Sequence, residues 1–133
     1  MNDTSTITGY HAHVYYDEAT RSAAARVREQ IADRFSVQMG RWRDEPVGPH
    51  VRAMYQVAFD VPLFATLVPW LMLNREGLTI LVHPNTDHPR DDHVLFPLWM
   101  GEVLDIKEEV LRNARPDREP IVPNTTPTDA ARP

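Results

Sequence analysis

The chain has 133 residues, a formal net charge of -5 and a pI near 5.6. This length is enough for one domain with a single hydrophobic core. The acidic balance, without a basic cluster, argues against nucleic acid or an anionic membrane as partner. The chain contains no cysteine, so any bound metal must be held by nitrogen and oxygen atoms.

The first eight residues are polar and lack the apolar stretch of a signal peptide. We expect 1–8 to be a flexible N-terminus. No apolar run approaches the length of a membrane span. These features predict a cytoplasmic protein that does not bind membranes.

Polar and apolar residues alternate over 9–16, which predicts a strand. Successive side chains of a strand point to opposite faces. One face therefore carries His11, His13 and Tyr15, and the other carries Ala12, Val14 and Tyr16. The face with Ala12, Val14 and Tyr16 can join a hydrophobic core, while the face with the histidines carries chemically functional side chains.

Apolar residues recur at helical spacing over 18–35, and Asp17 is suited to be the N-cap of that helix. A second helix is expected after Asp60 and should end at Gly77. Pro69 lies inside it and removes a backbone donor, so we expect a kink or break there.

Three further strands are expected. Residues 36–42 alternate weakly, and 51–59 and 78–83 are rich in β-branched and aromatic side chains. The proline- and glycine-containing segment 43–50 is expected to be a loop that places His50 at the start of the next strand.

The C-terminal part is predicted in four pieces: a polar loop over 84–93, a short edge strand over 94–100, a short helix over 101–113 and a proline-rich, disordered tail over 114–133. The ordered domain is therefore expected to span 9–113.

The order strand, helix, strand, strand, helix, strand predicts an α+β, ferredoxin-like sandwich (βαββαβ), with an antiparallel sheet and the helices on one face. We expect the strands at 9–16 and 51–59 to lie side by side and parallel. The strand at 78–83 should flank the first one in the opposite direction. The starts of the first and third strands and the end of the fourth would then meet.

This arrangement brings four of the six histidines together on the face away from the helices: His11, His13, His50 and His83. His88 and His93 follow in the next loop. The gathering predicts a metal site, and imidazole ligands suit iron, zinc, copper or nickel. A polar dimer face with hydrogen-bonded histidines is the alternative.

Other residues on this face have two interpretations each. Tyr15 and Arg52 are expected to contact a substrate, and Arg52 suits a carboxylate, although a solvated arginine explains it equally well. His93 is either an oriented acid/base or part of a solvated turn. The uncovered face, with Met54 and Leu81, predicts a homodimer.

Five short motifs occur in a fixed order along the chain. They are YHAHVYY at 10–16, GPH at 48–50, NREGLTILVHP at 74–84, DH at 92–93 and LWMG at 98–101. In this combination, over about 9–113, the chain resembles the DOPA 4,5-dioxygenase family.

The resemblance implies a non-haem iron(II) enzyme that opens the ring of a DOPA-like catechol with dioxygen, by extradiol-type cleavage. It implies iron(II), or another divalent metal in the protein as purified, and catechol and dioxygen as small-molecule partners. We expect His13, His50 and His83 to be the iron ligands, His11 to be an acid/base or alternate ligand, and His93 to be a second acid/base candidate.

Two alternatives remain at this point. One is a hydrolase or cupin-like oxidase that uses another metal. The other is a non-catalytic ferredoxin-like module that binds a small aromatic ligand or dimerises, with vestigial histidines.

Overall fold

The computed structural model describes residues 1–111, 120–125 and 127. These residues form a five-stranded sheet in the order β2-β3-β1-β4-β5, and every neighbouring pair is antiparallel. The strands are β1 (Gly9–Tyr16), β2 (Gln38–Met39), β3 (Ala53–Phe59), β4 (Ile80–Asn85) and β5 (Leu98–Met100). The helices are α1 (Arg21–Arg34), α2 (Phe64–Asn74) and α3 (Pro89–Val94), with short 3-10 turns at Thr4–Thr6, Val61–Leu63 and Glu108–Val110.

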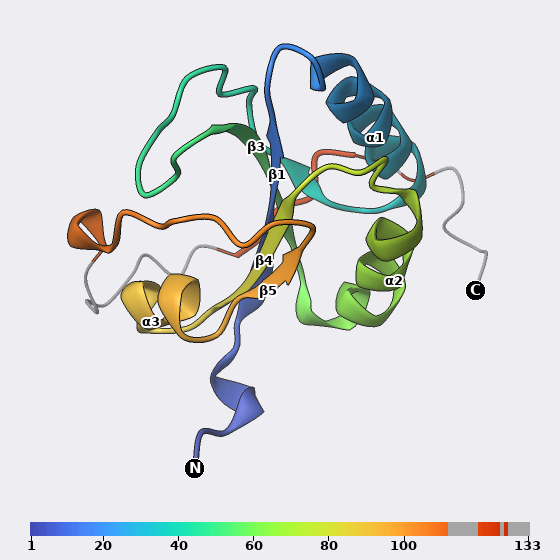
Figure 1. Cartoon of the computed structure of the whole chain (residues 1–133). Helices are drawn as coiled ribbons and strands as arrows, with labels where there is room; N and C mark the ends of the chain where they lie inside the picture. The colour runs from blue at the N-terminus through green and yellow to red at the C-terminus, as the bar shows by residue number, and fades with distance from the viewer. Residues whose placement is uncertain (112–119, 126, 128–133) are drawn as a thin grey trace.

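Helices α1 and α2 cover the same face of the sheet (Figure 1). The predicted ferredoxin-like sandwich is therefore confirmed. Its core lies between this face and the two helices. The fully buried side chains there include Val14, Val57 and Ile80 from the sheet, Val27 and Ile31 from α1, and Leu67 and Leu71 from α2. Each such side chain stabilises the fold by roughly 1.5–3 kcal/mol.

The predicted parallel pairing of the first and third strands was wrong. Strand β1 is antiparallel to β3, with Tyr16 opposite Ala53 and Tyr10 opposite Phe59. The reason is topological: α1 carries the chain across to β2, and β3 then returns beside β2 in the opposite direction. Strand β3 therefore begins beside the end of β1, not beside its start.

Helix α1 begins at Arg21, three residues later than predicted. The carboxylate of Asp17 accepts hydrogen bonds from the backbone N and the Oγ1 of Thr20, both at 2.9 Å. These bonds hold a turn before the helix, so Asp17 does not cap it.

Helix α2 continues through Pro69, so the predicted break is absent. The lost hydrogen bond and ring contact of an internal proline cost about 3 kcal/mol. Burial of Leu67, Val68 and Leu71 on the other side of the helix offsets this cost. Pro69 and Ala65 are exposed, so water can reach the carbonyl that the proline leaves without its donor.

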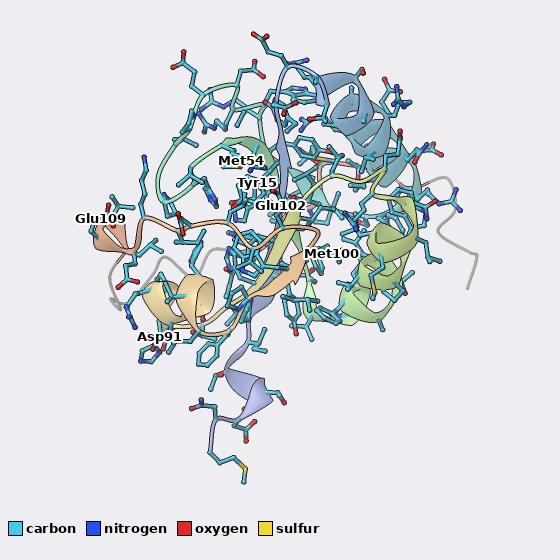
Figure 2. All side chains as sticks on the ribbon, viewed as in Figure 1. Tyr15, Met54, Asp91, Met100, Glu102 and Glu109 are labelled. Atoms are coloured by element: carbon cyan, nitrogen blue, oxygen red, sulfur yellow. The ribbon has the colours of Figure 1, made fainter. Side chains whose placement is uncertain are left out.

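The opposite face of the sheet is covered by irregular segments and not by long helices. Loop 40–52, segment 101–111 and α3 lie on this side (Figure 1). A small second core forms there from Tyr15, Met54 and Leu81, packed against Trp99, Leu104 and Ile106. Figure 2 shows Tyr15 and Met54 close together, as expected from their pairing between β1 and β3.

Two predictions for the C-terminal part were wrong. The segment 84–93, predicted as a loop, contains the start of α3, because Pro89 occupies the first helical turn, where a proline is tolerated. The described part of the predicted helix 101–113 is instead irregular, apart from an isolated bridge at Ile106 and the turn Glu108–Val110. Gly101 adopts a left-handed φ of 83°, which separates this segment from β5.

This covering removes the argument for a homodimer, which rested on an uncovered face, and the homodimer itself stays a prediction. Most of the tail predicted at 114–133 lies outside the described residues. No described helix has the length and apolar character to cross a membrane.

Candidate metal centre

Five of the six histidines meet on the face away from α1 and α2. His11 and His13 come from β1, His83 from β4, His50 from the loop before β3, and His93 from α3. His13, His50 and His83 are almost fully buried, with 2, 4 and 1% of their surface exposed. His88 lies just before α3 and is exposed, outside the cluster.

The pairing of β1 with β4 places three of these rings together. His11 lies directly opposite His83, and their ring centroids are 5.1 Å apart. The Nε2 atoms of His13 and His83 are 3.1 Å apart. The alternation of the two strands alone predicts this grouping, and here the prediction of a shared face is confirmed.

His50 reaches the cluster by a route that the sequence did not indicate. Because β3 runs antiparallel to β1, its first residue lies at the far end of β1. Loop 40–52 folds back over the sheet and pairs with segment 101–111: His50 bridges Ile106, and the Lys107 amide donates to the Pro49 carbonyl at 2.9 Å. The His50 ring thereby lies 4.2 Å from that of His13.

Helix α3 brings His93 to the cluster, with its ring 3.9 Å from that of His83. The helix is anchored by Asp92, whose buried carboxylate accepts from the backbone N and the Oγ1 of Thr86 at 2.8 and 2.7 Å. Burial nevertheless raises the pKa of Asp92. A proline in the first turn followed by acidic residues is a helix-start signal, and it could have revealed α3.

Backbone carbonyls set the tautomers of two rings. The Nδ1 of His83 donates to the Pro84 carbonyl at 2.9 Å, and the Nδ1 of His93 donates to the Pro89 carbonyl at 2.7 Å. A neutral ring that donates through Nδ1 carries an unprotonated Nε2. Both Nε2 atoms are thus in the form that binds metal ions, held by the kind of contact that orients metal-bound histidines.

His13 contains an unusual buried atom. Since the Nε2 of His83 is an acceptor, the 3.1 Å contact requires the Nε2 of His13 to be the donor. The buried Nδ1 of His13 then has a lone pair and no hydrogen-bond partner among the described residues. Leaving such an atom unpaired costs about 1–3 kcal/mol. A metal ion would remove this cost.

The histidines are held neutral. Burial, with a contribution from neighbouring imidazoles, lowers the pKa of His11 and of His50 to about 4 and lowers the pKa of His13 and His83 well below its ordinary value. Burial also raises the pKa of Tyr15, so its hydroxyl stays protonated. Neutral imidazole is the ligand form, so the cluster needs no deprotonation at neutral pH to bind a cation.

Two groups of histidines have ligand atoms that all lie within 4.8 Å of one another: His11 with His13 and His83, and His13 with His50 and His93. They share His13. The predicted ligands His13, His50 and His83 are thus all in the cluster, but they are divided between the two groups. Neither group contains a carboxylate.

A cavity of about 500 Å³ lies beside the cluster and is lined by His11, His83 and His93 together with residues of β2, β3 and the C-terminal part. His13 and His50 are not among the described residues that line this cavity. A smaller cavity of about 330 Å³ near the N-terminus touches only His83 of the histidines. The larger cavity is therefore the one from which a ligand can reach several imidazoles.

The two predicted substrate contacts lie elsewhere. Arg52 is exposed, and its Nη1 donates to the Glu102 carboxylate at 2.7 Å, in a separate groove beside Tyr16. Tyr15 is buried, and its hydroxyl shares a 2.7 Å hydrogen bond with the Nδ1 of His50. Neither residue lines the cavity beside the histidines.

Two curated proteins are similar in sequence to most of the chain. An uncharacterised 21.2 kDa protein of Botryotinia fuckeliana is 33% identical over 119 residues, which is 80% of this chain and 64% of that protein. A DOPA 4,5-dioxygenase of Amanita muscaria is 31% identical over 107 residues, which is 73% of this chain and 46% of that enzyme. The chain thus spans less than two thirds of the length of these curated relatives.

A crystal structure from Nostoc punctiforme, of a protein provisionally described as a dioxygenase, has a TM-score of 0.82 and 55% identity to the chain. The match covers 83% of this chain and 96% of that one. The Dopa 4,5-dioxygenase family model matches residues 10–110, which include all six histidines. The chain therefore belongs to the Dopa 4,5-dioxygenase family.

Proposed function

We propose that the protein is a non-haem iron(II) dioxygenase that opens the ring of a catechol by extradiol-type cleavage. Family membership and the Amanita muscaria relative support a dioxygenase acting on a DOPA-like substrate. The observation that carries the proposal is the buried all-histidine cluster beside a cavity of about 500 Å³. That volume is in the range of small-molecule sites.

The residues fit a metal ion. The neutral rings offer acceptor atoms: the Nε2 of His83 carries no proton, and the buried Nδ1 of His13 has no hydrogen-bond partner among the described residues. Imidazole ligands suit iron(II), and three of them leave coordination positions open. Another divalent metal can occupy such a site in the protein as purified, since nitrogen ligands bind several of them.

We assign His11, His13 and His83 as the ligands. They form one of the two compact groups, and both His11 and His83 line the cavity that a catechol would enter. His50, a ligand in the sequence-based hypothesis, belongs to the other group and is shielded from the cavity. In this assignment His50 is not a ligand. It supports the ligand rings from the side away from the cavity, and its hydrogen bond to Tyr15 fixes its orientation.

Iron(II) would supply a binding site for both catechol oxygens and the electrons needed for reaction with dioxygen. His93 lines the cavity, and its Nδ1 bond to Pro89 directs an unprotonated Nε2 into the site. That atom can accept a proton from a catechol hydroxyl and return it to the product. In the overall reaction the carbon–carbon bond beside the diol breaks, and both atoms of dioxygen enter the ring-opened product.

The test is to load the protein with iron(II) under anaerobic conditions, add catechols and then admit air. Ring opening gives a strongly coloured semialdehyde, so a new visible absorption band that depends on iron, catechol and air is the expected result. Binding of catechols without colour would contradict the proposal and favour a non-catalytic ligand-binding module. Colour with zinc in place of iron would also contradict it, because zinc supplies no electrons.

A further inference from the structure

The cavity beside the histidines has a wall that does not belong to the sandwich. Residues 120–125, which we call the C-terminal strap, lie along β2, and Pro120, Ile121 and Val122 line the cavity. The strap begins more than 15 residues after β5, the last strand of the sandwich. It also lies beyond residue 110, where the family match ends.

Hydrogen bonds to β2 and to the residues just before it anchor the strap. The Asn124 amide donates to the Val37 carbonyl at 3.0 Å, and the Met39 amide donates to the Asn124 Oδ1 at 3.0 Å. The Thr125 hydroxyl donates to the Phe35 carbonyl at 2.7 Å. Because these bonds follow the edge strand, the three lining residues are held in place at the cavity.

Ile121 packs directly onto the backbone at the start of β1. A Cβ placed on Gly9 would lie 2.8 Å from the Cδ1 of Ile121 and 3.2 Å from the Phe59 carbonyl oxygen. Real side chains do not approach so closely, so the absence of a side chain at Gly9 makes room for Ile121. This contact lies two residues before His11 in the same strand. Ile121 therefore closes the cavity near the proposed ligands.

Apolar side chains form part of the cavity lining. None of the described residues that line it is Lys or Arg. Its acidic residue, Asp92, already accepts hydrogen bonds from Thr86 through both oxygens. Beside the histidines, the lining includes the apolar side chains of Met39, Ala58, Ile121 and Val122.

We propose that the C-terminal strap is the specificity-determining wall of the catechol pocket. Ile121 limits the size of the ring substituent, so the cavity selects catechols with a small substituent over those with a bulky one. This inference rests on the proposed function, which supplies the catechol, but it concerns residues that the metal chemistry does not use.

The test compares the wild type with Ile121→Ala on catechol, 4-methylcatechol, 4-tert-butylcatechol and 3,4-dihydroxyphenylacetate. Removing the end of Ile121 should raise kcat/KM for the tert-butyl compound about tenfold, through KM, because one or two methylene groups change discrimination by about this factor. Unsubstituted catechol should change less than twofold. The carboxylate compound should change in the same direction by a smaller factor, because its substituent is less branched.

Two further variants distinguish a role of the strap as the wall of the pocket from a purely structural role. Asn124→Ala, which weakens the anchor without touching the cavity, should relax the same preference. Deletion of 128–133, which leaves the strap intact, should change nothing. Thermal unfolding of each variant identifies a loss of folding, and Asn124→Ala keeps the proposal testable if Ile121→Ala does not fold.

Anaerobic binding of the four catechols, measured by calorimetry, distinguishes the two proposals. If the wild type binds them with a preference that Ile121→Ala shifts but forms no coloured product, the dioxygenase proposal fails and the wall stands. If ring opening occurs but no variant alters the substituent preference, the wall proposal fails.

Discussion

The two faces of the sheet are built in different ways. On the helix face, regular elements enclose an apolar core, and a polar group such as the Tyr55 hydroxyl has its partner in the Ala24 carbonyl at 2.9 Å. On the histidine face, a loop, an irregular segment and the six-residue helix α3 enclose five imidazoles, one with a buried nitrogen that has no hydrogen-bond partner among the described residues. The first face is arranged for stability, whereas the second retains an unfavourable arrangement that a ligand can correct.

The largest expected effect is on the histidine face. His83→Ala removes a ligand of the proposed site, so iron affinity should fall at least about a hundredfold, beyond the range for residues that only orient ligands, and catechol turnover should be lost. Iron per chain and product absorbance are the measurements. His88→Ala is the matched control, because His88 is exposed outside the cluster and should leave both unchanged. Retention of iron by His83→Ala would remove His83 from the ligand set.

Large-to-small substitutions in the two cores should differ in their effect on metal binding more than in their effect on stability. Ile31→Ala on the helix face should lower the free energy of unfolding by about 2–5 kcal/mol, because it leaves a cavity among regular elements. Leu81→Ala, in the small second core and opposite His13 in the sheet, should cost a similar or smaller amount. Only Leu81→Ala should reduce iron bound per folded molecule. Urea unfolding and metal analysis measure the two effects, and equal iron loss in both variants would contradict the division.

The strand alternation predicted from the sequence accounts for much of this division. A period of two is local, so it placed His11, His13 and His83 on one face, although the direction assumed for the third strand was wrong. The helical spacing of apolar residues over 18–35 likewise predicted a helix with a buried face, which is α1.

The cover of the histidine face could not be predicted in this way. His50 reaches His13 through a backbone bond between Lys107 and Pro49, and such contacts between irregular segments have no periodic signature. The same is true of the contact between Ile121 and Gly9. The alternation of the strands was enough to predict that histidines gather on this face. Which imidazoles lie next to each other depends on these loop contacts.

Acid should destabilise the metal-free protein through the histidine face. The pKa of His11 and of His50 is about 4, below the ordinary 6.5 of the unfolded chain. The unfolded state therefore binds more protons below pH 6.5, and stability present above that pH is lost as the pH falls toward 4. Between pH 7 and pH 5, each of these histidines should lower the free energy of unfolding by on the order of 1–2 kcal/mol.

Urea unfolding at the two pH values measures this loss. His11→Gln should reduce the pH dependence. An unfolding free energy that is the same at pH 5 and pH 7 would show that the imidazoles are not held neutral. Iron should increase the pH dependence further, because protons compete with the metal for the same nitrogens.

The smallest expected effect comes from one hydroxyl on each face. Tyr15→Phe removes the 2.7 Å hydrogen bond to the Nδ1 of His50, and Tyr55→Phe removes the 2.9 Å bond to the Ala24 carbonyl. Both tyrosines are buried, so each substitution should lower the free energy of unfolding by about 1 kcal/mol. Tyr55→Phe should leave iron content and turnover unchanged, because its hydroxyl serves only the helix face.

Tyr15→Phe should keep its iron as well, since His50 is not a ligand in the proposed assignment, but turnover should fall severalfold as the His50 ring loses its orientation behind His13. Unfolding free energy, iron content and the initial rate of product formation are compared for the two variants. If Tyr15→Phe loses iron, then His50 is a ligand and the group of His13, His50 and His93 holds the metal. The paired substitution therefore decides between the two histidine groups, because it perturbs one of them through a single hydrogen bond.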